Sequence, residues 1–167
     1  MRGILVSVLL LAASPAAAAP FAHVRSEDAA VQSWLADGYA RSATFRALVD
    51  EIDGLPGIVY IEATVAVPLG LDGALLHSVA GSRDLPLLRV LVRWSLSRAT
   101  GIATIAHELQ HVAEVLRAGQ TADSAAISAL FGSIGETRST GSRHFETADA
   151  KRVTRRVLDE LDHNRPR

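Results

Sequence analysis

The sequence predicts a small α+β domain, and three observations support this fold class. Two segments, 58–67 and 87–94, are rich in β-branched and aliphatic residues and alternate as half-buried strands do. The segments before and after this pair have helical caps and helical spacing of their apolar residues. The chain has 167 residues, enough for one domain with a substantial core after an N-terminal leader is removed.

The N-terminus has the three regions of a secretory signal peptide. A basic start is followed by an apolar run at 4–13 and by the small-residue stretch SPAAAAP. We therefore expect a signal peptide at 1–18, cleaved after Ala18, and a single exported domain at 19–167 in the periplasm or the medium. An uncleaved anchor is the alternative, but the apolar run is shorter than the roughly 20 residues that span a bilayer. After cleavage we expect no membrane association.

The composition argues against nucleic-acid binding and excludes stabilisation by disulfides. The net charge is −1, and the one short basic segment, KRVTRR, is interrupted by apolar residues, so we expect no nucleic-acid binding. The chain has no cysteine, so export would not bring disulfides. Stability must then come from burial or from a bound ion.

Two helices are expected before the strands. The first spans 26–40 and opens with Ser26 as a cap, and the second spans 42–53 and ends at Gly54.

The strands follow, and we expect them to pair antiparallel, with Glu62 facing Arg89 or Arg93 across the pair. Their alternation predicts two buried rows: Val59, Ile61, Ala63, Val65 and Val67 in the first strand, and Leu88, Val90, Val92 and Trp94 in the second.

The second half of the chain is expected to be helical. Helices are predicted at 100–118, ended by Gly119, at 122–131, and at 143–162 after a break rich in glycine, serine and threonine. The connection between the strands, 68–86, is long for a compact domain, and such connections are often functional.

The helix at 100–118 contains the segment TIAHELQHVAEVL, Thr104 to Leu116. At about 100° per residue its large aliphatic side chains share a sector roughly 60° wide, while both histidines fall on the other side. We therefore expect one face in the core and the histidine face on the floor of a cleft. The aliphatic residues are Ile105, Leu109, Val112 and Leu116.

The spacing of the two histidines suits a metal site. His107 and His111 are one turn apart, so both imidazoles can reach one ion at about 2.0–2.1 Å. Glu108 projects to the side, where it can touch a water on that ion without binding the ion, as a general base requires. In a chain of this composition the pattern H-E-x-x-H arises by chance in roughly 1% of cases. A solvated face with two histidines is the alternative.

The motif HELQH resembles the active-site helix of the zincin metallopeptidases. That resemblance implies Zn²⁺ as cofactor, His107 and His111 as ligands, Glu108 as the residue that activates water, and a peptide or protein substrate. Glu114 and Arg117 occupy the positions where metzincins have glycine and a third histidine, so the chain does not resemble that branch. The segment HFETADAKRV, 144–153, is similar to the later helix from which gluzincins take a glutamate ligand.

Glu146 is the expected third protein ligand. In a helix from about residue 143 it would head a buried stripe, and a buried carboxylate needs a partner, a counter-charge or a metal. Its place in the first helical turn would favour the charged form. Two alternatives stay open: Glu136 is the third ligand, or Glu146 lies in water and binds no metal. The expected stripe comprises Ala150, Val153, Val157 and Leu161.

Outer partners and an oxyanion-holding group are also expected. Asp149 lies on the side of Glu146 and would hold one of the histidines, while Glu114 is expected beside the ligands or at the surface. Zincins place a tyrosine, histidine or arginine against the developing oxyanion. His144 is our candidate catalytic residue for this role, with His77 and Tyr60 as alternatives.

The sequence therefore predicts a small zincin-like domain with zinc-dependent peptidase activity. Two other functions stay open. One is a non-catalytic metal-binding or interaction module on the same scaffold, and the other is a structural helical protein whose histidines are accidental.

The signal peptide generates a first prediction. Mature protein recovered outside the cytoplasm should begin at or near Ala19, because cleavage after Ala18 completes the A-x-A site of Ala16 to Ala18. N-terminal sequencing tests this. An intact Met1 on membrane-bound material would establish an anchor instead.

Overall fold

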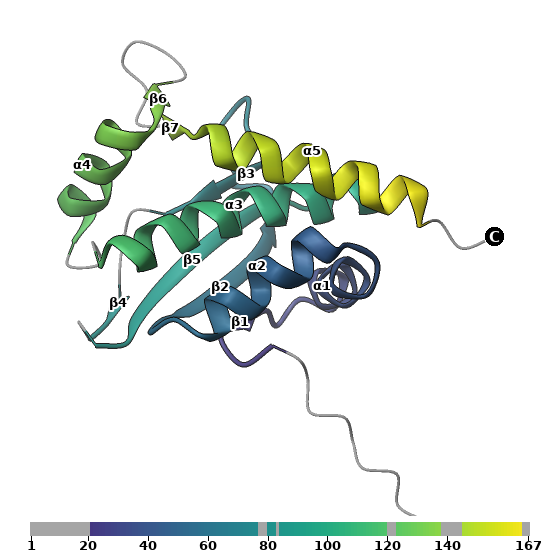
Figure 1. The fold of residues 1–167 in the computed structure, drawn as a ribbon, viewed down its shortest axis with the longest axis horizontal. Coiled ribbons are helices and arrows are strands. Elements are labelled where there is room, and N and C mark those ends of the chain that lie inside the picture. Colours follow the sequence, from purple (N-terminus) through teal and green to yellow (C-terminus); the bar gives the residue numbers. More distant parts are fainter. Residues whose placement is uncertain (1–20, 77–79, 83, 120–122, 138–144, 165–167) are drawn as a thin grey trace, which may run out of the picture.

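The computed structural model describes residues 21–76, 80–82, 84–119, 123–137 and 145–164. Within these ranges the chain is α+β, with five helices and a five-stranded sheet whose longer strands are parallel (Figure 1). The predicted signal peptide, 1–18, lies outside the described residues, as do His77 and His144. No helix in the described ranges combines the length and the apolar character needed to cross a membrane.

The sheet has the order β1-β2-β5-β3, with the short β4 also paired to β5. β1, β2 and β5 are parallel to one another, whereas β3 and β4 are antiparallel to β5. The strands are β1 (Val24–Arg25), β2 (Ile58–Thr64), β3 (Gly73–Leu75), β4 (Ala80–Gly81) and β5 (Pro86–Arg93).

The predicted antiparallel pairing of the two long strands is wrong. β2 and β5 run parallel, with Ile58 beside Leu87 and Thr64 beside Arg93. Parallel neighbours need a connection that carries the chain back to the starting end of the sheet. The segment between them provides it, because β3 and β4 run back along the far edge of β5 and the chain then turns into β5. The expected loop thus contains the return strands.

Most of the predicted strand faces are confirmed. Val59, Ile61, Leu88, Val90 and Val92 are buried.

Two expected core residues are exposed because their strands end earlier than predicted. Val65 follows the end of β2 and is 73% exposed, and Trp94 follows the end of β5 and is 62% exposed. On the outer face Arg89 donates to Glu62 at 2.7 Å, which confirms that predicted contact.

Two helices connect β1 to β2. α1 (Ala29–Arg41) is capped by Asp28, whose side chain accepts from the backbone of the first turn, so the cap is two residues later than the predicted Ser26. α2 (Ala43–Asp53) is capped by Ser42 as predicted. Both helices lie on the same face of the sheet as the central helix α3 (Figure 1).

α3 (Arg98–Ala118) lies between the sheet and α5 (Ala148–His163). It ends at Gly119, as predicted, where a φ of 61° places the glycine in the left-handed region. The expectation of one buried face is wrong, because α5 covers the side that carries the histidines. Polar residues of α3 are therefore buried with the aliphatic ones, among them Glu108, Gln110 and His111.

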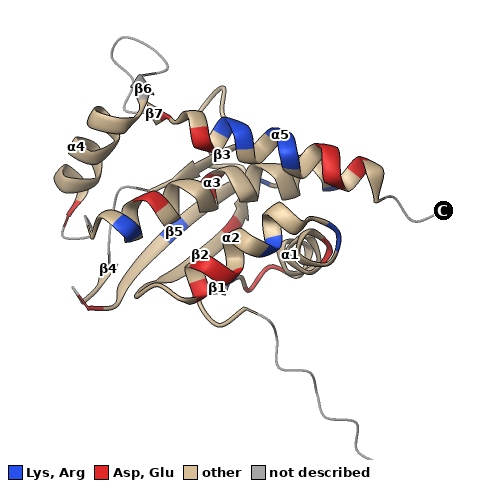
Figure 2. Ribbon diagram, in the orientation of Figure 1, with Lys and Arg blue, Asp and Glu red and all other residues tan. Residues whose placement is uncertain are grey.

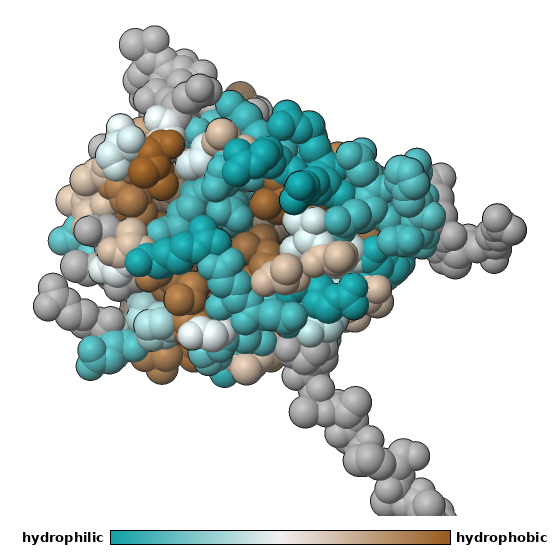
Figure 3. Space-filling view, viewed as in Figure 1, coloured by the Kyte–Doolittle hydropathy of each residue, from teal (hydrophilic) through white to brown (hydrophobic). Residues whose placement is uncertain are grey.

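α4 (Ser124–Ile134) stands to one side of this layer and carries no charged residue. Figure 2 shows it free of both charge colours, while α5 carries charges of both signs. Figure 3 shows hydrophobic residues gathered on the surface at the position of α4. It packs inward through Ile127 and Phe131. A short antiparallel pair, β6 (Glu136–Thr137) and β7 (Phe145–Glu146), then leads to α5.

The C-terminal part of α5 is attached to the start of α2 by one carboxylate. Glu160 accepts from the Ser42 hydroxyl at 2.6 Å, the Thr44 hydroxyl at 2.7 Å and the Thr44 backbone N–H at 3.0 Å. Burial raises the pKa of Glu160, but these hydrogen bonds outweigh it, so the pKa lies below its ordinary value.

Glu160→Gln should lower the free energy of unfolding by about 1 kcal/mol at pH 7, since it removes the charged acceptor from a partly exposed site. A carboxyl whose pKa is depressed on folding stabilises the protein above the unfolded pKa, ordinarily near 4.5. That contribution is lost as the pH falls through the folded pKa. The difference from wild type should therefore shrink below about pH 4.5.

Urea unfolding at several pH values measures this difference. Asp159→Asn, at an exposed position of the same helix, is the matched control and should change little. A deficit in Glu160→Gln that stays constant down to pH 3 would contradict the assignment.

Candidate metal centre

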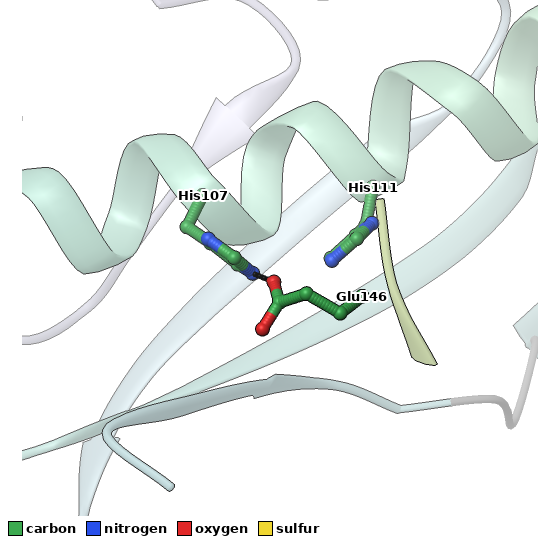
Figure 4. Close-up of side chains that lie close together, drawn as sticks. All are labelled: His107, His111 and Glu146. Atoms are coloured by element: carbon green, nitrogen blue, oxygen red, sulfur yellow. Dashed lines mark ion pairs between the residues drawn. The ribbon is translucent and has the colours of Figure 1, made fainter. Parts of the chain in front are cut away.

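Two elements far apart in the sequence bring three possible metal ligands together. His107 and His111 project from α3, and Glu146 reaches them from β7 (Figure 4). Each offers one ligand atom, and these atoms lie within 4.8 Å of one another. This cluster could hold a metal ion, and its members are the three ligands predicted from the sequence.

The carboxylate of Glu146 lies against the His107 ring. Its Oε1 is 2.9 Å from His107 Nε2, and the residue is 7% exposed. Glu146 is in β7 and not in the first turn of a helix, so the helical argument for its direction is wrong. Its direction comes from the strand, which pairs through the backbone with Glu136. Thr147 then caps α5, in which Ala150, Val157 and Leu161 of the predicted stripe are buried and Val153 is partly buried.

The second nitrogen of each imidazole has its own partner. His107 Nδ1 is 2.9 Å from the Thr154 hydroxyl, and His111 Nδ1 is 3.0 Å from Glu114 Oε2. Glu114 also accepts from the Thr147 hydroxyl at 2.9 Å. Burial raises the pKa of Glu114, but the hydrogen bonds that it accepts, first of all from His111, hold the pKa below its ordinary value. Glu114 is therefore the carboxylate beside the histidines, one of the two places that the sequence allowed for it.

Asp149 does not have the role predicted for it. It is exposed and pairs with Arg152 in the next turn of α5. Two threonines that sequence analysis missed have this role instead. Thr154 contacts the His107 ring directly, and Thr147 acts on His111 through Glu114. They are seven residues apart, so they lie two turns apart on one side of the helix. In the sequence, the only feature that could have indicated these two partners is the seven-residue spacing of their hydroxyl groups.

Aromatic rings close one side of the cluster. The His107 and His111 rings meet edge to face with centroids 4.9 Å apart, and Phe131 of α4 meets His111 in the same way at 5.1 Å. Phe131 in turn stacks on Phe145, with centroids 6.2 Å apart. α4 and β7 thus give the cluster an apolar wall, which limits water and strengthens electrostatic interactions there.

Glu108 is buried against the edge strand β3. It is 7% exposed, and its Oε2 accepts from the Leu75 backbone N–H at 2.8 Å. A Cβ on Gly73 would lie 2.9 Å from Oε1 and 2.6 Å from the Thr104 methyl carbon, so only glycine allows this approach. Burial raises the pKa of Glu108 above its ordinary value, against the opposing influence of His111, His107 and the Leu75 N–H.

The remaining predicted residues are not part of the described cluster. Tyr60 alternates with the core residues Val59 and Ile61, so it lies on the opposite face of the sheet from α3. That position excludes it as an oxyanion-holding group. His144 and His77, the other candidates for that role, lie outside the described residues, as does the side chain of Glu136.

Comparison of the chain with protein-family models, with curated proteins and with solved structures gives no match.

The cluster generates a third prediction. Glu146→Ala should reduce zinc affinity by more than about 100-fold, because the loss of an outer partner alone typically costs 10–100-fold. Asp149→Ala should bind like wild type, since Asp149 is exposed and paired elsewhere. Competition titration against a chromophoric chelator measures the zinc affinities of the wild type and of each variant. Wild-type affinity in Glu146→Ala, with loss in Glu136→Ala, would show that the other glutamate is the ligand.

Proposed function

We propose that the protein is a zinc-dependent peptidase with a small zincin-like fold, acting on peptide or protein substrates after export. The observation that carries this proposal is the convergence of His107, His111 and Glu146, with Glu108 next to the first ligand in the chain. The motif HELQH, similar to that of the zincins, supports the choice of reaction. The glutamate from a later segment supports the likeness to gluzincins.

The donor set fits zinc. Two imidazole nitrogens and one carboxylate oxygen form the ligand set of a common class of catalytic zinc site, which leaves a position for water or substrate. Calcium and magnesium prefer sites made wholly of oxygen atoms. His107 Nε2 and Glu146 Oε1, 2.9 Å apart, are two of the atoms that would face the ion. Bound zinc would supply Lewis acidity, which activates water and polarises a carbonyl group.

The side chains around this set have separate tasks in the proposed reaction. Glu108 would take the proton from the attacking water and return it to the leaving amine. Its carboxylate is already oriented, because the Leu75 N–H holds Oε2 while Gly73 leaves room beside Oε1. The apolar wall of Phe131 and Phe145 would exclude bulk water from one side of the histidines.

A second candidate function is a non-catalytic zinc-binding or interaction module. The observation in its favour is the same burial of Glu108, since a carboxylate bonded to the edge strand also has a structural reason to be present. The two functions differ in whether a peptide is cleaved, not in whether zinc is bound.

Glu108→Gln separates them. The amide keeps an acceptor for the Leu75 N–H and leaves all three ligands in place, but it cannot accept the proton. Peptide hydrolysis should therefore fall by about 10²-fold or more, while zinc affinity stays within a few-fold of wild type. His107→Ala should instead lose the metal.

Hydrolysis is measured on a broad peptide library with zinc-loaded protein, and Glu62→Gln, on the outer face of the sheet, is the matched control. If the zinc-loaded wild type cleaves nothing in the library, the binding-module function is favoured. Unchanged hydrolysis in Glu108→Gln would remove Glu108 from the mechanism.

A further inference from the structure

We propose that Thr154 and Glu114 fix the tautomers of the two histidines before any metal binds, so that both Nε2 atoms present lone pairs to the ion. In this inference the two residues are positioning residues: they act on the metal through the imidazoles. The inference rests on the metal site of the proposed function.

The direction of the proton at His107 follows from the backbone of α5. The Thr154 hydroxyl donates to the Ala150 carbonyl at 2.8 Å. A hydroxyl has one hydrogen, so toward His107 Nδ1, 2.9 Å away, its oxygen can only accept. His107 Nδ1 must then carry the hydrogen, and the neutral ring has its lone pair on Nε2.

That lone pair faces a carboxylate. His107 Nε2 is 2.9 Å from Glu146 Oε1, so the lone pairs of both atoms can be directed at one metal ion. The hydrogen-bond chain from Ala150 through Thr154 to His107 thus organises this pair for a cation.

His111 is set by a second chain, built on Glu114. The Thr147 hydroxyl accepts from the Ala150 N–H at 3.2 Å and donates to Glu114 Oε1 at 2.9 Å. Gln110 Nε2 donates to the same oxygen at 3.2 Å. The other oxygen, Oε2, is left as the acceptor for His111 Nδ1 at 3.0 Å.

The two chains begin on the same short segment. Ala150 supplies its carbonyl to Thr154 and its N–H to Thr147, so the first turns of α5 orient both rings of α3. The rings differ in the group behind them, which is a neutral hydroxyl for His107 and a carboxylate for His111. A carboxylate makes the imidazole a stronger electron donor, so removal of Glu114 should weaken zinc binding more than removal of the Thr154 hydroxyl.

The test begins with nitrogen-15 NMR of the metal-free mature protein near pH 8, above the ordinary imidazole pKa of about 6.5. Long-range proton–nitrogen spectra distinguish the two tautomers of each histidine. Wild type should show His107 and His111 with hydrogen on Nδ1. In Thr154→Val the His107 signal should move toward the other tautomer while His111 keeps its own.

Zinc affinity provides the second readout. Thr154→Val should weaken binding about 10-fold and Glu114→Ala up to about 100-fold. Thr154→Ser, which restores the hydroxyl, should recover both the tautomer and the affinity. Thr100→Val, which removes an exposed hydroxyl at the other end of α3, is the matched control and should change neither.

His107 carrying hydrogen on Nε2 in the metal-free wild type would overturn the inference. So would Thr154→Val with unchanged tautomer and affinity. Since the tautomers are read without metal or substrate, absence of hydrolysis would count against the peptidase alone.

Discussion

The packing of α5 across α3 is the contact on which the rest of the site depends. It turns a helix with one expected buried face into one that is enclosed by the sheet on one side and by α5 on the other. Polar side chains on that second side are buried or partly buried, and an unpartnered buried polar group is costly. α5 and the residues just before it accordingly supply partners for His107 and Glu114, and Glu114 is in turn the partner of His111 on the same helix.

The sheet contributes to the site through its edge. The return strand β3 lies beside α3, where the Leu75 N–H binds Glu108. In this sheet β5 lies between β2 and β3, and β2 and β5 are parallel. The same topology that contradicts the expected antiparallel pair therefore places a backbone donor next to the glutamate of the HELQH motif. Gly73 permits the approach, because any larger residue would collide with the side chains of α3.

The residues of the metal cluster and their hydrogen-bond partners come from two segments that lie far apart in the sequence. His107, Glu108, His111 and Glu114 come from two turns of one helix, so their relative directions follow from helical geometry alone. Glu146, Thr147 and Thr154 are more than thirty residues further on, and they arrive with α5. A metal ion held here would link the two segments, so metal binding and the docking of α5 on α3 would stabilise one another.

The sequence by itself determined the helices, the two long strands, the burial of Val59, Ile61, Leu88 and Val90, and the placement of His107 and His111 one turn apart. These follow from local periodicity, capping and the spacing of HELQH, which act over a few residues. Tertiary structure alone decided the parallel pairing, the burial of the histidine face, the position of Glu146 in a strand, and the choice of Glu114 and Thr154 over Asp149 as imidazole partners. Such features depend on which distant segment packs against which face, and local sequence patterns do not determine that packing.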